Sequence, residues 1–114
     1  MKMKMDIELP QFTKQRRYQR TLVPGNFVVA WQGGGRHGAS RVRDLSLGGI
    51  YIWNPDPPDP GTPMQLHFDG PEGAFRVSAQ VRYVKPHAGM GIQFVGMDFP
   101  ARRSLASLLQ RLMA

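Results

Sequence analysis

The sequence of 114 residues contains no cysteine. Without thiols it can form neither a disulfide framework nor a metal site built on thiolates. No apolar run approaches the roughly 20 residues that a helix needs to cross a bilayer. The first eight residues alternate lysine with methionine and then turn acidic, unlike the apolar stretch of a secretory signal. We therefore expect a soluble, cytoplasmic protein whose length suits a single domain.

Residues typical of catalysis are sparse and scattered. The three histidines, His37, His67 and His87, lie far apart, and no pair has metal-ligand spacing. None accompanies a serine in the G-x-S-x-G context of a nucleophilic hydrolase. The glycine-rich segment 33–38 lacks the Lys-Ser/Thr pair of a phosphate-binding P-loop, so we predict a flexible hairpin there. We expect neither an enzyme, nor a metal, nor a cofactor.

Acidic residues are few: eight, against fifteen lysines and arginines, which gives a formal net charge of +7. Residues 1–43 contain nine bases and two acids, whereas residues 44–100 contain six acids and three bases. A basic first third beside an acidic middle suits an anionic partner that binds the N-terminal part. A basic surface that serves only solubility explains the charge alone equally well.

Most of the sequence has the pattern of short strands separated by glycine and proline. Six runs fit this pattern: 27–31, 39–43, 50–53, 64–68, 75–84 and 90–95. In the fifth run alternate residues are predicted to share one face: Phe75, Val77, Ala79, Val81 and Tyr83. Residues 54–63 hold five prolines and predict a stiff, extended connection. Six strands without intervening helices predict an all-β antiparallel barrel or sandwich, and a closed barrel leaves no exposed edges.

The last part of the sequence changes to the period of an amphipathic helix. Its apolar stripe comprises Leu105, Leu108, Leu109, Leu112 and Met113. Three arginines lie on the opposite face: Arg102, Arg103 and Arg111. Asp98 suits the N-cap and Pro100 suits the first turn. We predict a C-terminal helix that covers the barrel; a docking helix for a partner is the alternative.

An arginine motif stands out in the polar N-terminal stretch. Arg16 and Arg20 are spaced as R-x-x-x-R, with Arg17 between them. A guanidinium group is a planar fork of donors that binds phosphate oxygens in pairs and also stacks on purines. A spacing of four lets both groups reach one compact ligand. We predict an arm, up to about Pro24, that is mobile without ligand and closes on an anionic nucleotide.

A second motif, D-x-S-x-x-G, occupies residues 44–49 between two predicted strands. The Asp44 carboxylate can accept both N–H donors on the Watson–Crick edge of guanine, and Ser46 adds a hydroxyl. Gly48 and Gly49 lack side chains, which lets a ligand approach the backbone and permits positive φ in the turn. The competing explanation is that Asp44 and Ser46 only bond the backbone of their own turn. Together the two motifs predict a site for a small guanine nucleotide.

The two motifs, in this order and some two dozen residues apart, resemble those of the PilZ domain family. Weaker agreement continues in residues 79–83 and 91–94, which look like that family's two closing strands. The resemblance extends from Gln15 to the final helix. It implies a six-stranded antiparallel β-barrel with a C-terminal helix over residues 15–114, preceded by a flexible arm at residues 1–14.

The resemblance also implies a ligand, the bacterial second messenger cyclic di-GMP. In that family the arginines wrap around the dinucleotide, and the second motif lines the barrel against a guanine. The implied ligand-binding residues are Arg16, Arg17, Arg20, Asp44, Ser46, Gly48 and Gly49. Every defining position is filled, unlike in the divergent members that do not bind the nucleotide. We expect a receptor whose arm changes conformation on binding and which signals to a partner protein, with one or two ligands per chain.

Two other functions fit parts of the sequence. A small basic barrel could bind single-stranded nucleic acid through stacking on four aromatic residues: Phe27, Trp31, Tyr51 and Trp53. Core packing explains these aromatic residues equally well, and the acidic middle third would repel a long phosphate backbone, so nucleic acid is not the expected partner. A protein-interaction module with a vestigial nucleotide site is the third interpretation, and the complete motifs argue against it.

Overall fold

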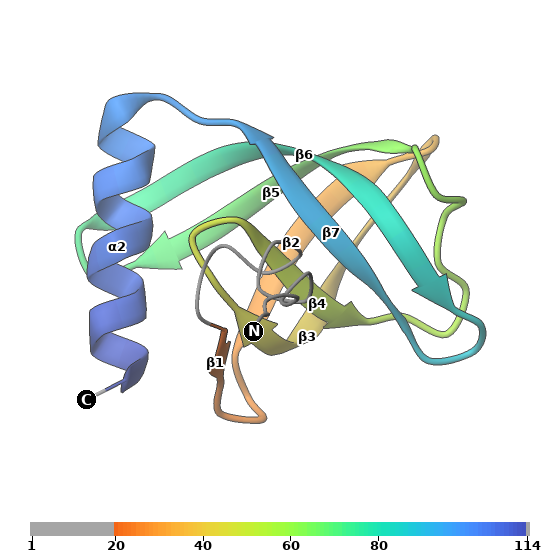
Figure 1. Cartoon of the computed structure of the whole chain (residues 1–114), viewed down its shortest axis with the longest axis horizontal. Coiled ribbons are helices and arrows are strands. Elements are labelled where there is room, and N and C mark those ends of the chain that lie inside the picture. Colours follow the sequence, from red (N-terminus) through yellow and green to blue (C-terminus); the bar gives the residue numbers. More distant parts are fainter. Residues whose placement is uncertain (1–19, 114) are drawn as a thin grey trace, which may run out of the picture.

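The computed structural model describes residues 20–113. Arg16, Arg17 and the predicted arm at residues 1–14 lie outside the described residues, so the boundary at residue 15 stays a prediction. The described chain contains, in order, β1 (Thr21–Leu22), β2 (Val28–Gly33), β3 (Arg36–Leu45), β4 (Gly49–Trp53), β5 (Pro63–Gly70), β6 (Gly73–Lys85), β7 (Gly89–Gly96) and α2 (Phe99–Met113) (Figure 1).

Six of the strands close into a barrel. They follow one another as β3, β2, β5, β6, β7 and β4, and β4 pairs back onto β3, with every pair antiparallel. The predicted six-stranded antiparallel β-barrel is confirmed, and each predicted run overlaps one of these strands. The extra strand, β1, was not predicted. It has only two residues, Thr21 opposite Leu45 and Leu22 opposite Asp44.

Alternation of apolar and polar residues builds the core, because successive side chains of a strand point to opposite faces. In β5 the buried residues are Met64, Leu66 and Phe68, which alternate with more exposed polar ones. Both faces of β4 are buried, since Ile50 and Ile52 belong to the core and Tyr51 is covered on the outer wall. Because β4 is paired with β3 on one side and with β7 on the other, the turn that precedes it is held at a defined place on the barrel.

The prediction for Tyr83 is wrong. The β6–β7 pairing passes from Val81 opposite Ile92 to Tyr83 opposite Gly91, so Arg82 is an extra residue that interrupts the ladder. Such a bulge reverses the facing of the residues after it. Tyr83 therefore lies on the outer wall, 40% exposed, instead of facing the core with Val81.

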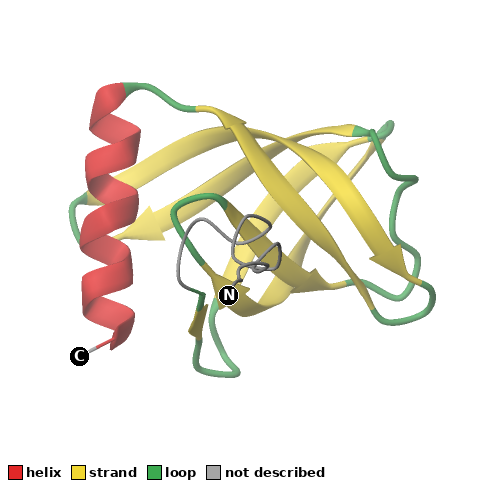
Figure 2. Ribbon diagram, in the orientation of Figure 1, coloured by secondary structure: helices red, strands yellow, loops and turns green. Residues whose placement is uncertain are grey.

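The predicted helix covers one end of the barrel (Figure 2). Its buried residues are Ala101, Leu105, Leu108 and Leu109. The amide of Ala101 donates to Asp98 Oδ1 at 2.8 Å, which confirms the predicted N-cap. Met113, placed in the apolar stripe by its spacing, is exposed because it ends the helix beyond the barrel. The described part of the chain has no helix with the length and apolarity needed to span a bilayer.

The glycine-rich segment is the hairpin that the sequence predicts. Gly34 and Gly35, with φ of 62° and 77°, connect β2 to β3 in a tight turn of the kind that requires positive φ at both positions. The proline-rich segment connects β4 to β5 through residues 54–62, but it is not extended throughout: the Thr62 amide donates to the Asp59 carbonyl at 3.1 Å, which closes a turn.

Candidate functional site

Asp44, near the end of β3, is the centre of the candidate site. Its side chain is almost fully buried and bonds two arginines: Arg20 Nη1 lies 2.5 Å from Oδ1, and Arg43 Nε lies 2.8 Å from Oδ2. A buried carboxylate without such partners would be costly. Each carboxylate oxygen has two lone pairs, so each can accept a further donor besides its arginine.

A bulge in β3 turns Asp44 outward. The β3–β4 pairing passes from Val42 opposite Ile52 to Asp44 opposite Tyr51, which leaves Arg43 as the extra residue. Val42 and Leu45, on either side, both belong to the core. Without the extra residue, Asp44 would share the inner face with Val42. The bulge thus brings Arg43 and Asp44 together on the outer wall.

The short strand β1 positions Arg20. Its pairing places Thr21 opposite Leu45, and the Val23 amide donates to the Arg43 carbonyl at 3.1 Å. Arg20, which precedes Thr21, therefore lies beside the end of β3 and reaches Asp44. The expectation that the arm is mobile as far as Pro24 stays a prediction, and in this structure β1 pairs with β3.

Ser46 shapes the turn between β3 and β4. Its Oγ accepts hydrogen bonds from the amides of Gly48 and Gly49, each at 3.1 Å, and its own amide donates to the Gly49 carbonyl at 2.9 Å. Ser46 is buried. It bonds the backbone of its own turn, as the competing explanation holds, whereas Asp44 bonds arginines. Within the second motif, Ser46 therefore forms the turn and Asp44 holds Arg20.

Gly49 is required by close packing. A Cβ atom there would lie 2.6 Å from the Ile92 carbonyl oxygen and 3.6 Å from Arg20 Nη2. The expectation of positive φ at Gly48 and Gly49 is wrong: within residues 20–113 the positive-φ glycines are Gly34, Gly35, Gly61 and Gly73. The bare Gly49 lets β4 approach β7 and leaves room for the guanidinium of Arg20. The structure thus brings Arg20, Asp44, Ser46 and the two glycines together at one turn.

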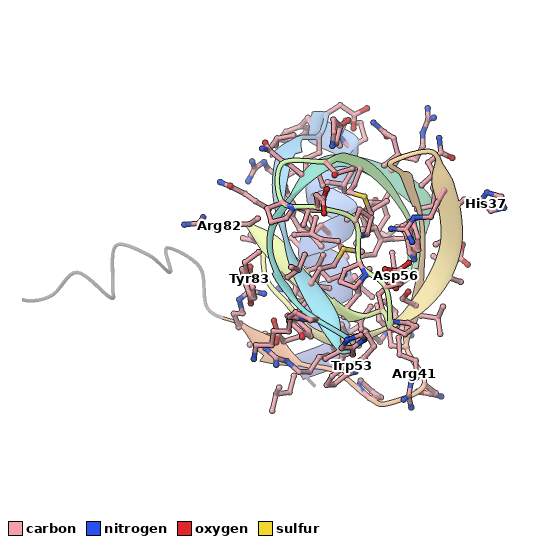
Figure 3. All side chains as sticks on the ribbon, turned by 90° about the vertical axis from the view of Figure 1, so that its right-hand side faces the viewer. His37, Arg41, Trp53, Asp56, Arg82 and Tyr83 are labelled. Atoms are coloured by element: carbon pink, nitrogen blue, oxygen red, sulfur yellow. The ribbon has the colours of Figure 1, made fainter. Side chains whose placement is uncertain are left out.

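An aromatic group lies beside this turn, and the sequence indicates two of its members, Tyr51 and Trp53, only as candidates for stacking on nucleic acid. Arg43 Cζ lies 3.9 Å from the centre of the Tyr51 ring. The ring of Trp53 meets Tyr51 edge-on at 5.6 Å between centroids, and that of Tyr83 lies at 6.2 Å. Tyr51 and Trp53 share the outer face of β4, and the bulges at Arg43 and Arg82 bring Arg43 and Tyr83 to the same wall. The alternation of apolar residues does not reveal either bulge. Figure 3 shows Tyr83 projecting from the wall opposite to the one that carries His37.

Tyr51 carries an unsatisfied polar atom. Its side chain is fully buried, and Oη has no hydrogen-bond partner in the part of the chain that the structure describes. Burial raises the pKa of the Tyr51 hydroxyl above its ordinary value of about 10, although the positive charge of Arg43 opposes the shift. The folded state therefore holds this proton to higher pH than the unfolded state. Stability is retained below about pH 10 and falls as the pH rises further.

Replacing Tyr51 by phenylalanine removes this hydroxyl and keeps the ring. We expect Tyr51→Phe to raise the free energy of unfolding by about 1 kcal/mol at pH 7, because an unpaired buried group is lost. The difference should widen above pH 10, where only the parent chain loses stability through Tyr51. Urea unfolding at pH 7 and pH 10.5 measures both effects. If the difference in free energy of unfolding between Tyr51→Phe and the parent chain is the same at both pH values, this description of Tyr51 is contradicted.

Residues 20–113 contain no cluster of three histidine, aspartate or glutamate side chains arranged to hold a metal ion. The site consists of two guanidinium groups, one carboxylate, a glycine turn and an aromatic wall. Such a set of donors and flat surfaces suits a ligand that is both anionic and aromatic.

Solved structures with the same fold give a comparison. The PilZ domain with c-di-GMP of YcgR from Escherichia coli is 20% identical, with a TM-score of 0.73 over 87% of this chain and 92% of that chain. The PilZ domain of CeSA from a cellulose-synthesizing bacterium is 17% identical, with a TM-score of 0.65 over 84% and 99%. At these identities the similarity shows the fold alone.

A third solved structure, the MrkH–c-di-GMP complex of K. pneumonia, is 16% identical, with a TM-score of 0.66 over 86% of this chain and 52% of that chain. None of the curated proteins compared with the chain matches it. The family model described as the PilZ domain matches residues 14–111, which is most of the sequence. The chain therefore belongs to the PilZ domain family.

Proposed function

We propose that this chain is a receptor for cyclic di-GMP that acts as a non-enzymatic adaptor. The contact between Arg20 and Asp44 carries the proposal, because it joins the two sequence motifs on one surface of the barrel. The solved relatives support it, since the YcgR and MrkH structures contain c-di-GMP. The ligand offers two phosphates and two guanines, which match the guanidinium groups and the carboxylate of the site.

The proposed roles follow from hydrogen-bond chemistry. Arg20, with Arg16 and Arg17 from the preceding segment, binds phosphate oxygens and guanine. Asp44 holds Arg20 in place and accepts the guanine N–H donors on its remaining lone pairs. Hydrogen bonds to charged groups contribute about 1.5–3 kcal/mol each, and a micromolar complex needs about 8 kcal/mol. Three arginines and one aspartate can supply this, even after the cost of ordering the segment.

Ser46, Gly48 and Gly49 support the ligand through the shape of the turn. The Ser46 hydroxyl fixes the two glycine amides, and the absence of a side chain at Gly49 leaves room for the Arg20 guanidinium. A ligand in contact with Arg20 can therefore lie directly against the backbone here.

We also infer a route for the signal. The segment before Arg20 closes on the ligand, and β1 follows Arg20 directly. Since β1 contacts both β3 and α2, a change at Arg20 reaches the surface near the C-terminal helix. A partner protein that binds this surface would distinguish the free receptor from the occupied one.

Amide hydrogen exchange with and without cyclic di-GMP tests this closure. We expect exchange to slow at residues 16–20 when the ligand is added, because the segment gains contacts there. The β6 segment 75–84 is the internal control and should change little, since the barrel is already closed. Equal exchange at residues 16–20 in both states would show that no closure occurs.

The nucleic-acid alternative loses its stacking surface. Of its four aromatic residues, Trp31 and Tyr51 are buried and Phe27 is partly buried, which leaves Trp53 as the exposed one. Trp31 also donates its Nε1–H to Ser40 Oγ at 2.9 Å, as a residue of the folded barrel wall. Tyr83, on the same wall, is also 40% exposed, but two rings do not make the series of platforms on which successive bases stack.

A further inference from the structure

Arg43 is held in place on two sides. Its Nε donates to Asp44 Oδ2 at 2.8 Å, and its Cζ lies 3.9 Å above the centre of the Tyr51 ring. A guanidinium group over an aromatic face is favourable because the positive charge meets the negative face of the ring. Arg43 and Tyr51 themselves lie outside the two motifs that define the proposed ligand site, whereas Asp44 belongs to the second of them.

Tyr51 forms a firm base for Arg43. A Cβ atom at Gly89 would lie 2.8 Å from Tyr51 Oη, so the ring packs directly against the backbone of β7. Trp53 meets the ring edge-on, and Lys85 Nζ lies 5.8 Å from its centre. Tyr51 itself is fully buried. The position of the guanidinium above it is therefore well defined before any ligand binds.

Arg43 is only partly covered by these contacts. The side chain is 38% exposed, although one of its faces covers Tyr51 and its Nε is engaged by Asp44. Arg20 and Arg43 bond the two oxygens of the same carboxylate, so a ligand in contact with Arg20 has Arg43 within reach. An exposed, fixed and planar cation next to the proposed site is suited to a planar aromatic group.

We propose that Arg43 binds a guanine base of the ligand by stacking, so that the base, the Arg43 guanidinium and the Tyr51 ring form three layers. The inference rests on the proposed function, since the guanine is that of cyclic di-GMP. It adds a residue outside both motifs to the binding site. It also gives Tyr51 a role on the outer wall, where its ring supports the guanidinium.

The substitution Arg43→Lys tests the stack. Lysine keeps the positive charge but has no planar group to place between Tyr51 and a base. We expect the Kd for cyclic di-GMP, measured by calorimetry, to rise roughly fivefold to thirtyfold, as loss of a desolvated cation–π contact predicts. Arg41→Lys is the matched control, because Arg41 is an exposed residue of the same strand with the same substitution, and its Kd should not change.

The outcomes separate the two proposals. If the parent chain does not bind cyclic di-GMP, the proposed function fails. If the parent chain binds and Arg43→Lys binds equally well, the stacking inference fails and the proposed function stands. Equal losses in Arg43→Lys and Arg41→Lys would also overturn the stack. Thermal melting of both variants should match that of the parent chain, and a large drop confined to Arg43→Lys would mean that Arg43 serves the fold instead.

Discussion

Replacing Arg20 by alanine is expected to weaken cyclic di-GMP binding by tenfold or more. Arg20 is the residue in which the two motifs meet, because its guanidinium lies on Asp44 and beside Gly49. Loss of hydrogen bonds to a charged ligand group costs about 1.5–3 kcal/mol, and every 1.4 kcal/mol is a factor of ten in Kd. Arg16→Ala should have an effect of the same size if both arginines bind the dinucleotide.

Stability should change little in Arg20→Ala. Asp44 keeps Arg43 as a partner, so its carboxylate does not become an unpaired buried charge. Arg103→Ala, on the exposed face of α2, is the control for the loss of one positive charge. It should bind like the parent chain in the same calorimetric titration. Unchanged affinity in both Arg16→Ala and Arg20→Ala would remove the roles assigned to these arginines.

Replacing Gly49 by alanine is expected to have the largest effect on stability. The new Cβ atom would lie 2.6 Å from the Ile92 carbonyl oxygen, which belongs to the backbone of β7 and cannot move independently. Overpacking of this kind costs about 1–3 kcal/mol, or roughly 5–15 °C in Tm for a domain of this size. Movement of β4 away from β7 would also disturb the turn beneath Arg20, so the affinity for cyclic di-GMP should fall as well.

Gly25→Ala is the matched control for this change. A Cβ atom at Gly25 has nothing within 4 Å, and its φ is not positive. Its Tm should stay the same or rise slightly, because alanine restricts the unfolded chain. Scanning calorimetry of the two variants beside the parent chain makes the comparison. If Gly49→Ala melts with the parent chain, close packing is not the reason for glycine at this position.

Much of the barrel could be predicted because its signals are local. The alternation in β5 and β6 follows from the two-residue period of a strand. The two glycines at the β2–β3 turn follow from the positive φ angles that a tight hairpin requires. The N-cap at Asp98 likewise depends on neighbouring residues alone. These features need no knowledge of what packs against them, and the structure has all of them except the end of the β6 alternation, at Tyr83.

The arrangement of the site could not be predicted in the same way. A two-residue strand such as β1 has no periodicity, yet it places Arg20 on Asp44. The bulge at Arg43 depends on how β3 must bend to pair with both β2 and β4, which is a property of the closed barrel. For the same reason the alternation in β6 predicts the wrong face for Tyr83, and neither motif indicates Arg43. The motifs indicate which residues meet, whereas the bulges determine how they face one another.

The most direct test is a calorimetric titration of the purified chain with cyclic di-GMP at physiological salt. The proposed receptor should bind with a saturable isotherm and a Kd near the micromolar range. A generic single-stranded oligonucleotide, titrated under the same conditions, should give no comparable binding. Absence of binding by the dinucleotide, together with oligonucleotide binding that weakens steeply as salt increases, would contradict the proposed function and favour a nucleic-acid-binding barrel.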